Sequence, residues 1–298
     1  MVLVFVLGLG AAVLLALGFV IQQHAAARAP AEERLSIRLL LDLARRPLWL
    51  GGIAAMVGGQ ILGATALARG SLPLVEPLLA ANILFALPLS AAWTRQRLGW
   101  REWAGAFVLM GGLALFVGAA GPTQEQASKV STVGWIIACC AIAGVVALLI
   151  WAAKRLEVVE EATLLAAGAG ILYGLQDGFT QRSLLVFGHG GLGAMMASWH
   201  PYALVAAAIV GLILAQSAFE AAPLAASLPT LTIAEPITGI GLGAGLFSQG
   251  LRLSPLPLAL ELLGILLMAV GVYMVARSPV VTGGGASESG TGTSQAAA

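Results

Sequence analysis

Three acidic side chains lie inside apolar stretches of the sequence, where little water is present to solvate a charge. Asp177 is near the middle of one such stretch, and Glu76 and Glu235 each stand directly before a proline. An ionised carboxylate at the centre of a bilayer costs about 2.5–3.5 kcal/mol on insertion scales, so each of the three requires a reason to be there. These carboxylates could form a cation or proton site, or they could anchor neighbouring helices by hydrogen bonds.

Helical spacing places further polar side chains on the Asp177 face. Tyr173, Thr180 and Gln181 stand at i−4, i+3 and i+4 from Asp177, positions that are neighbours on a helix surface. The pattern predicts a site lined by these oxygens, with Asp177, Tyr173 and Gln181 as candidate binding residues. The alternative, a structural anchor between helices, has equal weight.

The prolines after Glu76 and Glu235 affect the helices that carry these carboxylates. Proline lacks an amide donor and clashes with the carbonyl one turn back, so Pro77 and Pro236 are predicted to kink or break their helices. Carbonyls freed beside a carboxylate are hard oxygen ligands, suited to Mg²⁺, Na⁺ or a proton-coupled site. Asp177 and Glu235 are the candidate metal ligands, whereas Glu76 could instead be an interfacial residue that reaches water.

The Glu-Pro pairs belong to a pattern that occurs twice, with a Gln, a Ser-Leu-Pro and two Glu residues in each copy. The members are Gln60, Ser71-Leu72-Pro73, Glu76 and Glu102 in the first copy and Gln216, Ser227-Leu228-Pro229, Glu235 and Glu261 in the second. In both copies the Gln precedes the Ser-Leu-Pro by 11 residues and the two Glu are 26 residues apart. We interpret this as an internal duplication, which is typical of membrane transporters.

Other members of the pattern have structural explanations beside functional ones. Gln60 and Gln216 could orient a substrate, but glutamines also join membrane helices by hydrogen bonds, and we favour that role slightly. Glu102 and Glu261 each follow a loop and open a helix, where a carboxylate interacts favourably with the helix dipole, so we interpret them as capping residues. Arg182 is expected to extend to the outer surface and His200 to be interfacial rather than a ligand.

Composition sets the class of the protein. The 298 residues are 59% hydrophobic and 10% charged, with a mean hydropathy of +0.94, whereas soluble domains have about a quarter of charged residues. The chain is therefore expected to be an integral membrane protein in contact with the lipid bilayer. A net charge of +1 without a basic stripe gives no reason to expect nucleic acid. No phosphate-binding loop, nucleophile elbow or cluster of metal ligands is present, so we do not expect an enzyme.

The apolar runs predict an all-α protein with about nine membrane-spanning helices, ten being the alternative. They cover residues 2–21, 47–68, 71–92, 102–120, 133–153, 162–187, 193–219, 221–249 and 255–276, each close to or above the roughly 20 residues that cross a bilayer. The polar connection at 22–46 has leucines at helical spacing and predicts a short amphipathic helix. We expect one transmembrane domain at 1–278 and a disordered cytoplasmic tail at 279–298.

Basic residues predict the orientation, because Lys and Arg are enriched in cytoplasmic loops. Alternate connections carry eleven and four basic residues, which places the N-terminus outside and the C-terminus in the cytoplasm of a plasma or inner membrane. The two copies are offset by five spans, an odd number, so equivalent helices cross in opposite directions. The prediction is an inverted-topology repeat, with repeat one at about 1–120 and repeat two at about 133–277.

Several of these segments carry a family resemblance. The stretch Ser71-Leu72-Pro73-Leu74-Val75-Glu76-Pro77-Leu78, continuing through Arg97-Leu98-Gly99 to Gly112, resembles the drug/metabolite transporter superfamily of EamA-like proteins, and 227–236 looks like the same element in the second half. Nine spans and Gly18-Phe19-Val20-Ile21-Gln22-Gln23 at the end of the first helix are most similar to its NIPA-like magnesium-transporter branch. Gln96 stands where a Glu commonly precedes Arg-Leu in the superfamily, which places the coupling mechanism in question.

The resemblance and the buried carboxylates lead to the same functional hypothesis. We expect a secondary transporter that moves a small solute or metal cation by alternating access, without a resident cofactor. Mg²⁺ is one candidate substrate, an organic amine or metabolite is another, and H⁺ or Na⁺ could couple the transport. The alternative is a membrane scaffold or accessory subunit that transports nothing. The oligomeric state is open, with a homodimer among the options.

Overall fold

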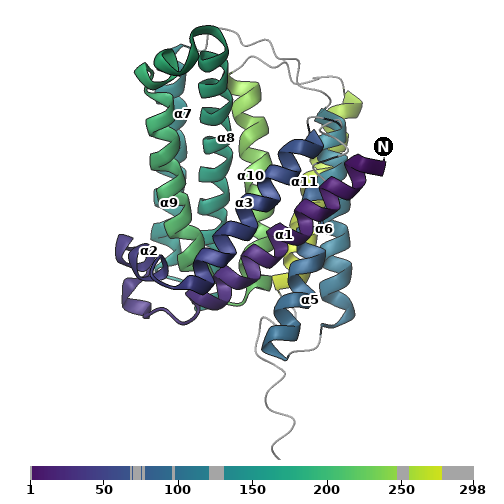
Figure 1. Ribbon diagram of the computed structural model, residues 1–298. Helices are drawn as coiled ribbons and strands as arrows, with labels where there is room; N and C mark the ends of the chain where they lie inside the picture. Colours follow the sequence, from purple (N-terminus) through teal and green to yellow (C-terminus); the bar gives the residue numbers. More distant parts are fainter. Residues whose placement is uncertain are drawn as a thin grey trace, which may run out of the picture.

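The computed structural model describes residues 2–67, 69, 75, 78–95, 98–120, 131–246 and 255–276, and all regular elements in these ranges are helical (Figure 1). The elements are α1 (Val2–Ala26), η1 (Ala31–Glu33), α2 (Ile37–Leu43), α3 (Pro47–Leu67), α5 (Asn82–Thr94), α6 (Trp100–Ala120), α7 (Thr132–Ala153), α8 (Val158–Ala197), α9 (His200–Ala221), α10 (Leu224–Leu246) and α11 (Pro255–Ala276).

Seven helices in the described part of the chain are long and apolar enough to cross a membrane: α1, α3, α6, α7, α8, α9 and α11. This confirms the all-α, multi-pass class. The two other predicted spans coincide in part with α5 and α10. α5 has 13 residues, and α10 is long enough but carries Ser227, Thr230, Thr232 and Glu235 among its apolar residues. The count of nine stays a prediction.

The structure corrects the predicted boundary between the sixth and seventh spans. The residues up to Ala197 are helical, but 193–197 form a short segment after Gly191 and do not open the next long helix. Gly191, at φ 68° and ψ −169°, interrupts the helical backbone of α8 between the two predicted spans, and Ser198 in extended conformation separates α9 from the short helical segment that follows Gly191. α9 then begins at His200. Between Ser183 and Trp199 only His189 is ionisable, so hydropathy does not indicate the second interruption at Ser198.

Proline does not break α10. The helix runs from Leu224 to Leu246 through Pro229 and Pro236, so the break predicted at Pro236 is wrong, while a kink there stays a prediction. Pro236 has no amide hydrogen, which leaves the Thr232 carbonyl without its helical donor. Pro77, the corresponding residue of the first copy, lies outside the described residues.

α6 and α11 pack in backbone contact through two pairs of glycines. A Cβ added at Gly112 would lie 2.7 Å from the Gly264 carbonyl oxygen, and one added at Gly271 would lie 2.7 Å from that of Gly105. Gly105 thus faces Gly271 and Gly112 faces Gly264, so the two helices run antiparallel. Small residues permit this close approach, which is a main source of helix association in membranes.

α8 is the central helix of the second half, because it packs against α7, α9 and α10 (Figure 1). Its Gly170 and Gly174 meet the backbone of α10, with added Cβ atoms 2.5 Å from the carbonyl oxygens of Leu231 and Glu235. The residue numbers increase together on both helices, so α8 and α10 are parallel. In the first half, α1 packs against α3 and α5.

The connection between α1 and α3 contains the predicted short amphipathic helix. α2 begins after Ser36, whose hydroxyl accepts a hydrogen bond from the Arg38 amide. Its Leu39 and Leu43 are completely buried, and the helix contacts α9. This connection therefore brings the first half of the chain onto the second.

Candidate functional site

The structure places two of the predicted carboxylates in the middle of neighbouring parallel helices. Glu235 lies at the centre of α10, where the Gly174 backbone of α8 touches it. Asp177 lies at the centre of α8 and is exposed, although most of the surrounding helix is buried. Two mid-helix carboxylates on packed helices meet the first requirement of a binding site within a membrane.

Tyr173 lies on the same part of α8 and connects with Glu235. The Glu235 carboxylate interacts electrostatically with the Tyr173 hydroxyl. The Tyr173 ring packs on Gly211 of α9, where an added Cβ would lie 2.9 Å from the ring. Tyr173 therefore fills the junction of α8, α9 and α10.

Asp177 is displaced from Glu235 along the helix axis. Gly174 is level with the Glu235 carbonyl, and Asp177 follows Gly174 by three residues, or about 4.5 Å of helical rise. In the part of the chain that the structure describes, no group of three His, Cys, Asp or Glu residues could hold a metal ion. Asp177 and Glu235 could contribute single carboxylate ligands to a hydrated cation, since Mg²⁺ usually keeps several waters.

Gln216 belongs to a different, buried network near one end of the bundle. Its Nε2 donates to Gln22 Oε1 at 2.5 Å, and Trp49 Nε1 donates to Gln216 Oε1 at 3.1 Å. Gln22 Nε2 lies 2.6 Å from the Met56 sulfur. α1, α3 and α9 are joined through a glutamine that is 0% exposed, which is the helix-joining role favoured from sequence.

The remaining candidates do not join these groups. Gln60 on α3 is exposed, unlike its sequence counterpart Gln216. Gln181 is part of α8, but its side chain lies outside the described residues, as does all of Glu76. Glu102 opens α6 as predicted, whereas Glu261 is the seventh residue of α11 and is 7% exposed, so the capping interpretation of Glu261 is wrong.

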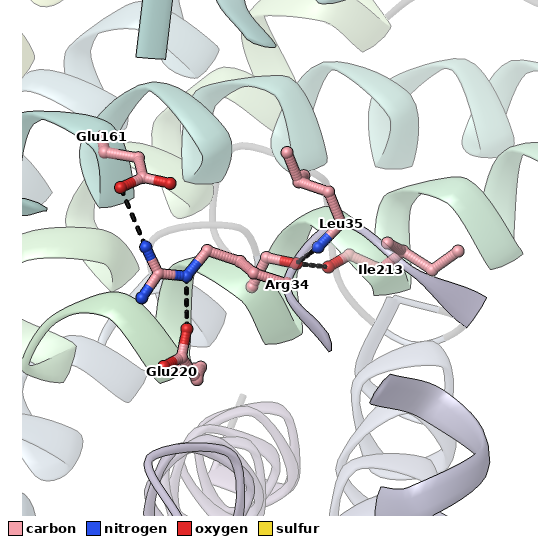
Figure 2. A network of polar contacts seen from close by, with 6 residues as sticks. Arg34, Leu35, Glu161, Ile213 and Glu220 are labelled. Atoms are coloured by element: carbon pink, nitrogen blue, oxygen red, sulfur yellow. Dashed lines mark hydrogen bonds and ion pairs between the residues drawn. The ribbon is translucent and has the colours of Figure 1, made fainter. Parts of the chain in front are cut away.

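Sequence reasoning missed an arginine that joins the α1–α3 connection to two helices of the second half (Figure 2). Arg34 Nη1 lies 2.9 Å from Glu161 Oε2 on α8, and Arg34 Nε pairs with Glu220 Oε2 on α9. These hydrogen bonds, with Glu220 contributing most, raise the pKa of Arg34 above its ordinary value. The three residues are far apart in sequence, so no local pattern indicates the contact.

Leu35 continues this attachment through its backbone. Its amide donates to Ser217 Oγ at 3.0 Å, and Ser217 Oγ donates to the Ile213 carbonyl at 2.7 Å (Figure 2). Leu35 has φ of 59°, a left-handed conformation that is uncommon for a leucine. We refer to Arg34, Leu35, Glu161, Ser217 and Glu220 as the Arg34 clamp.

A small cavity lies at the same end of the bundle, where α1, α5 and the start of α10 meet. Its volume is about 80 Å³, and Gln23, Ser90 and Thr94 provide polar lining beside Leu87, Leu98 and Pro223. This space is sufficient for about two water molecules. Two of the helices that line the cavity, α5 and α10, also carry buried polar atoms without a hydrogen-bond partner among the described residues. These atoms are Asn82 Oδ1, Ser227 Oγ and Thr230 Oγ1.

Comparison with known proteins adds one relative. The chain is 27% identical over 278 residues to an uncharacterized protein of Corynebacterium glutamicum, and the similarity covers 93% of this chain and 95% of that protein. No protein-family model and no solved structure matches the chain. The similarity therefore extends over nearly the whole length of both proteins.

Proposed function

We propose that the protein is a secondary transporter of the drug/metabolite type, which moves a small solute or cation across the membrane by alternating access. The observation that supports this most directly is the exposure of Asp177 at the centre of α8. A carboxylate facing lipid at this depth would cost about 2.5–3.5 kcal/mol. An exposed carboxylate on a water-filled path avoids that cost and offers a charge to a passing cation.

The arrangement around Asp177 fits this proposal. Tyr173 and Glu235 supply further oxygens within about one helical turn, at the junction of α8, α9 and α10. Unpartnered Asn82, Ser227 and Thr230 on α5 and α10 provide additional polar groups between this junction and the small cavity. Buried polar atoms without protein partners are expected where a solute or water must pass.

The packing of α6 against α11 favours two inverted repeats. The duplicated sequence pattern makes Gly105 equivalent to Gly264 and Gly112 equivalent to Gly271. In the structure, each glycine meets the equivalent of the other glycine on its own helix, since Gly105 meets Gly271 and Gly112 meets Gly264. Reciprocal contacts of this kind are typical of elements related by a two-fold axis. An in-plane axis between inverted halves is the architecture on which alternating access operates.

Flux through reconstituted protein tests the function. Uptake of Mg²⁺, and separately of a panel of organic cations, is measured in proteoliposomes with the wild type, Asp177→Asn and Glu235→Gln. Glu157→Gln is the matched control, because Glu157 is an exposed carboxylate at the start of the same helix as Asp177. We expect saturable uptake of at least one cation that falls about tenfold or more in the Asp177 and Glu235 variants, as loss of a charged contact worth 1.5–3 kcal/mol implies.

The experiment also separates transport from its alternative. A membrane scaffold without transport activity is favoured by the Gln22–Trp49–Gln216 network, in which conspicuous polar residues only join helices. Absence of flux for every cation in well-folded protein would support the scaffold. Flux that is identical in wild type, Asp177→Asn and Glu235→Gln would refute the assignment of these carboxylates while leaving transport in place.

A further inference from the structure

Aromatic side chains cluster at the end of the second half that is remote from the Arg34 clamp. There α7 and α9 begin, and α8 passes between them. Trp135 stacks on Phe179 with ring centroids 4.9 Å apart, and Trp199 meets both rings edge-on at 6.1 and 5.6 Å. His200 stacks on Trp199 at 4.3 Å. Trp135 and Phe179 are almost fully buried, whereas Trp199 is 39% exposed. The cluster therefore opens to the surroundings on the Trp199 side.

Three polar groups at this cluster have no hydrogen-bond partner among the residues that the structure describes. They are Arg182 Nε, Ser183 Oγ and His200 Nδ1. Ser183 is only 5% exposed and His200 only 8%. Arg182 and His200 interact electrostatically, so the guanidinium and the imidazole lie near each other. Arg182 and Ser183 are consecutive on α8, and a ligand that hydrogen-bonds to these unpartnered atoms would offset the cost of desolvating them.

The local charge is positive. α9 begins at His200 with no side-chain hydrogen bond to its cap, and although Pro201 has no amide hydrogen, the dipole of this helix end favours an anion. α7 contains no acidic residue. Asp177, on α8, precedes Arg182 by five residues, or about 7.5 Å of rise and roughly 140° of rotation, and thus lies on another face. No described carboxylate at this end competes for the arginine.

We propose that Arg182, Ser183 and His200 form a binding site for a phosphate group. The guanidinium supplies charge and paired donors, which suit a phosphate geometrically. The serine hydroxyl and the imidazole add donors, and the aromatic rings exclude water from the buried side. The phosphate belongs either to an anionic lipid headgroup or to a soluble phosphate compound. The site is separate from the proposed Asp177 path and does not depend on transport activity.

Binding is measured with two probes. Inorganic phosphate is titrated into the detergent-purified protein while tryptophan fluorescence is followed, since Trp135 and Trp199 adjoin the site. Retention of phosphatidylglycerol against phosphatidylcholine is measured by native mass spectrometry. Saturable binding of phosphate alone identifies a soluble ligand, and selective retention of phosphatidylglycerol identifies a lipid headgroup. Either result supports the site; absence of both overturns it.

Variants assign the binding to these residues. Arg182→Gln should weaken binding at least about tenfold, as loss of a charged hydrogen bond implies, and Ser183→Ala should weaken it by a smaller factor. Arg69→Gln is the matched control, because Arg69 is exposed, its guanidinium donates to the Thr65 carbonyl, and the substitution removes the same charge. Equal binding by wild type, Arg182→Gln and Ser183→Ala would overturn the proposal. The Ser183 and Arg69 variants keep it testable even if Arg182→Gln fails to fold.

Discussion

Two adjacent glycines of α6 provide a sharp test of how the halves of the protein meet. A Cβ added at Gly112 would lie 2.7 Å from both the Gly264 carbonyl oxygen and the Met268 amide nitrogen, which are backbone atoms that cannot rotate away. A Cβ added at Gly111 meets no atom within 4 Å. Gly112→Ala should therefore force α6 and α11 apart, whereas Gly111→Ala should fit without displacement.

The magnitudes follow from these distances. Moving a backbone contact from 2.7 Å to ordinary separation requires the helices to shift by about 0.7 Å, and overpacking of this kind costs about 1–3 kcal/mol. Replacing glycine by alanine within a helix stabilises it by about 0.5–1 kcal/mol. We expect Gly112→Ala to lower the free energy of unfolding by about 1–2 kcal/mol and Gly111→Ala to raise it slightly.

The assay is equilibrium unfolding in mixed micelles, followed by circular dichroism. Gly264→Ala provides a second check, because its added Cβ would lie 2.8 Å from the Gly112 carbonyl oxygen. Once the helices have separated to admit one methyl group, the second should cost less. The combined Gly112→Ala and Gly264→Ala effect should thus be smaller than the sum of the single effects. Similar stability of the Gly111 and Gly112 variants would refute the close pairing of α6 and α11.

Two further predictions concern the end of the bundle that contains the Arg34 clamp. Arg34→Gln should lower the free energy of unfolding by about 2–3 kcal/mol, because the Arg34 side chain is 20% exposed and that of Glu220 is 8%, which places this ion pair between exposed and buried ones. A double-mutant cycle with Glu220→Gln that shows no coupling would contradict this prediction. Gln216→Leu should cost about 1–3 kcal/mol by leaving its two hydrogen-bond partners unpaired. Gln60→Leu, at the exposed counterpart, should change stability by less than about 0.5 kcal/mol in the same unfolding assay.

Hydropathy was sufficient to locate most helices. The prediction for residues 255–276 agrees with α11 at both ends, and that for 133–153 differs from α7 by one residue. These helices are bounded by polar or charged segments that end the apolar run. The gap predicted at 188–192 contains the interruption at Gly191, but the start of α9 at His200 could not be predicted, because it depends on the extended backbone of Ser198. Hydropathy shows which segments are apolar enough to enter the membrane, but it does not show where the backbone leaves helical geometry inside such a segment.

The contacts of the candidate site residues could not be predicted from the sequence, because they depend on which helices pack against each other. Gln60 and Gln216 hold equivalent places in the duplicated pattern, yet one is exposed and the other completely buried. A repeat determines where a residue lies on its helix, whereas the neighbouring helices determine what the residue does. The Arg34 clamp has the same character, since the partners of Arg34 are 127 and 186 residues away.

The contrast between residues of the duplicated pattern and residues outside it predicts which side chains determine substrate selectivity. Residues that follow the duplicated pattern, such as Gly105 and Gly264, mainly form the helix contacts of the scaffold. Asp177 precedes the second copy of the pattern and has no assigned counterpart in the first. If alternating access depends on the symmetric packing, variants of the glycines should slow transport of all substrates equally. Variants of Asp177 should instead alter the preference among substrates, because only that carboxylate presents its charge at the centre of α8.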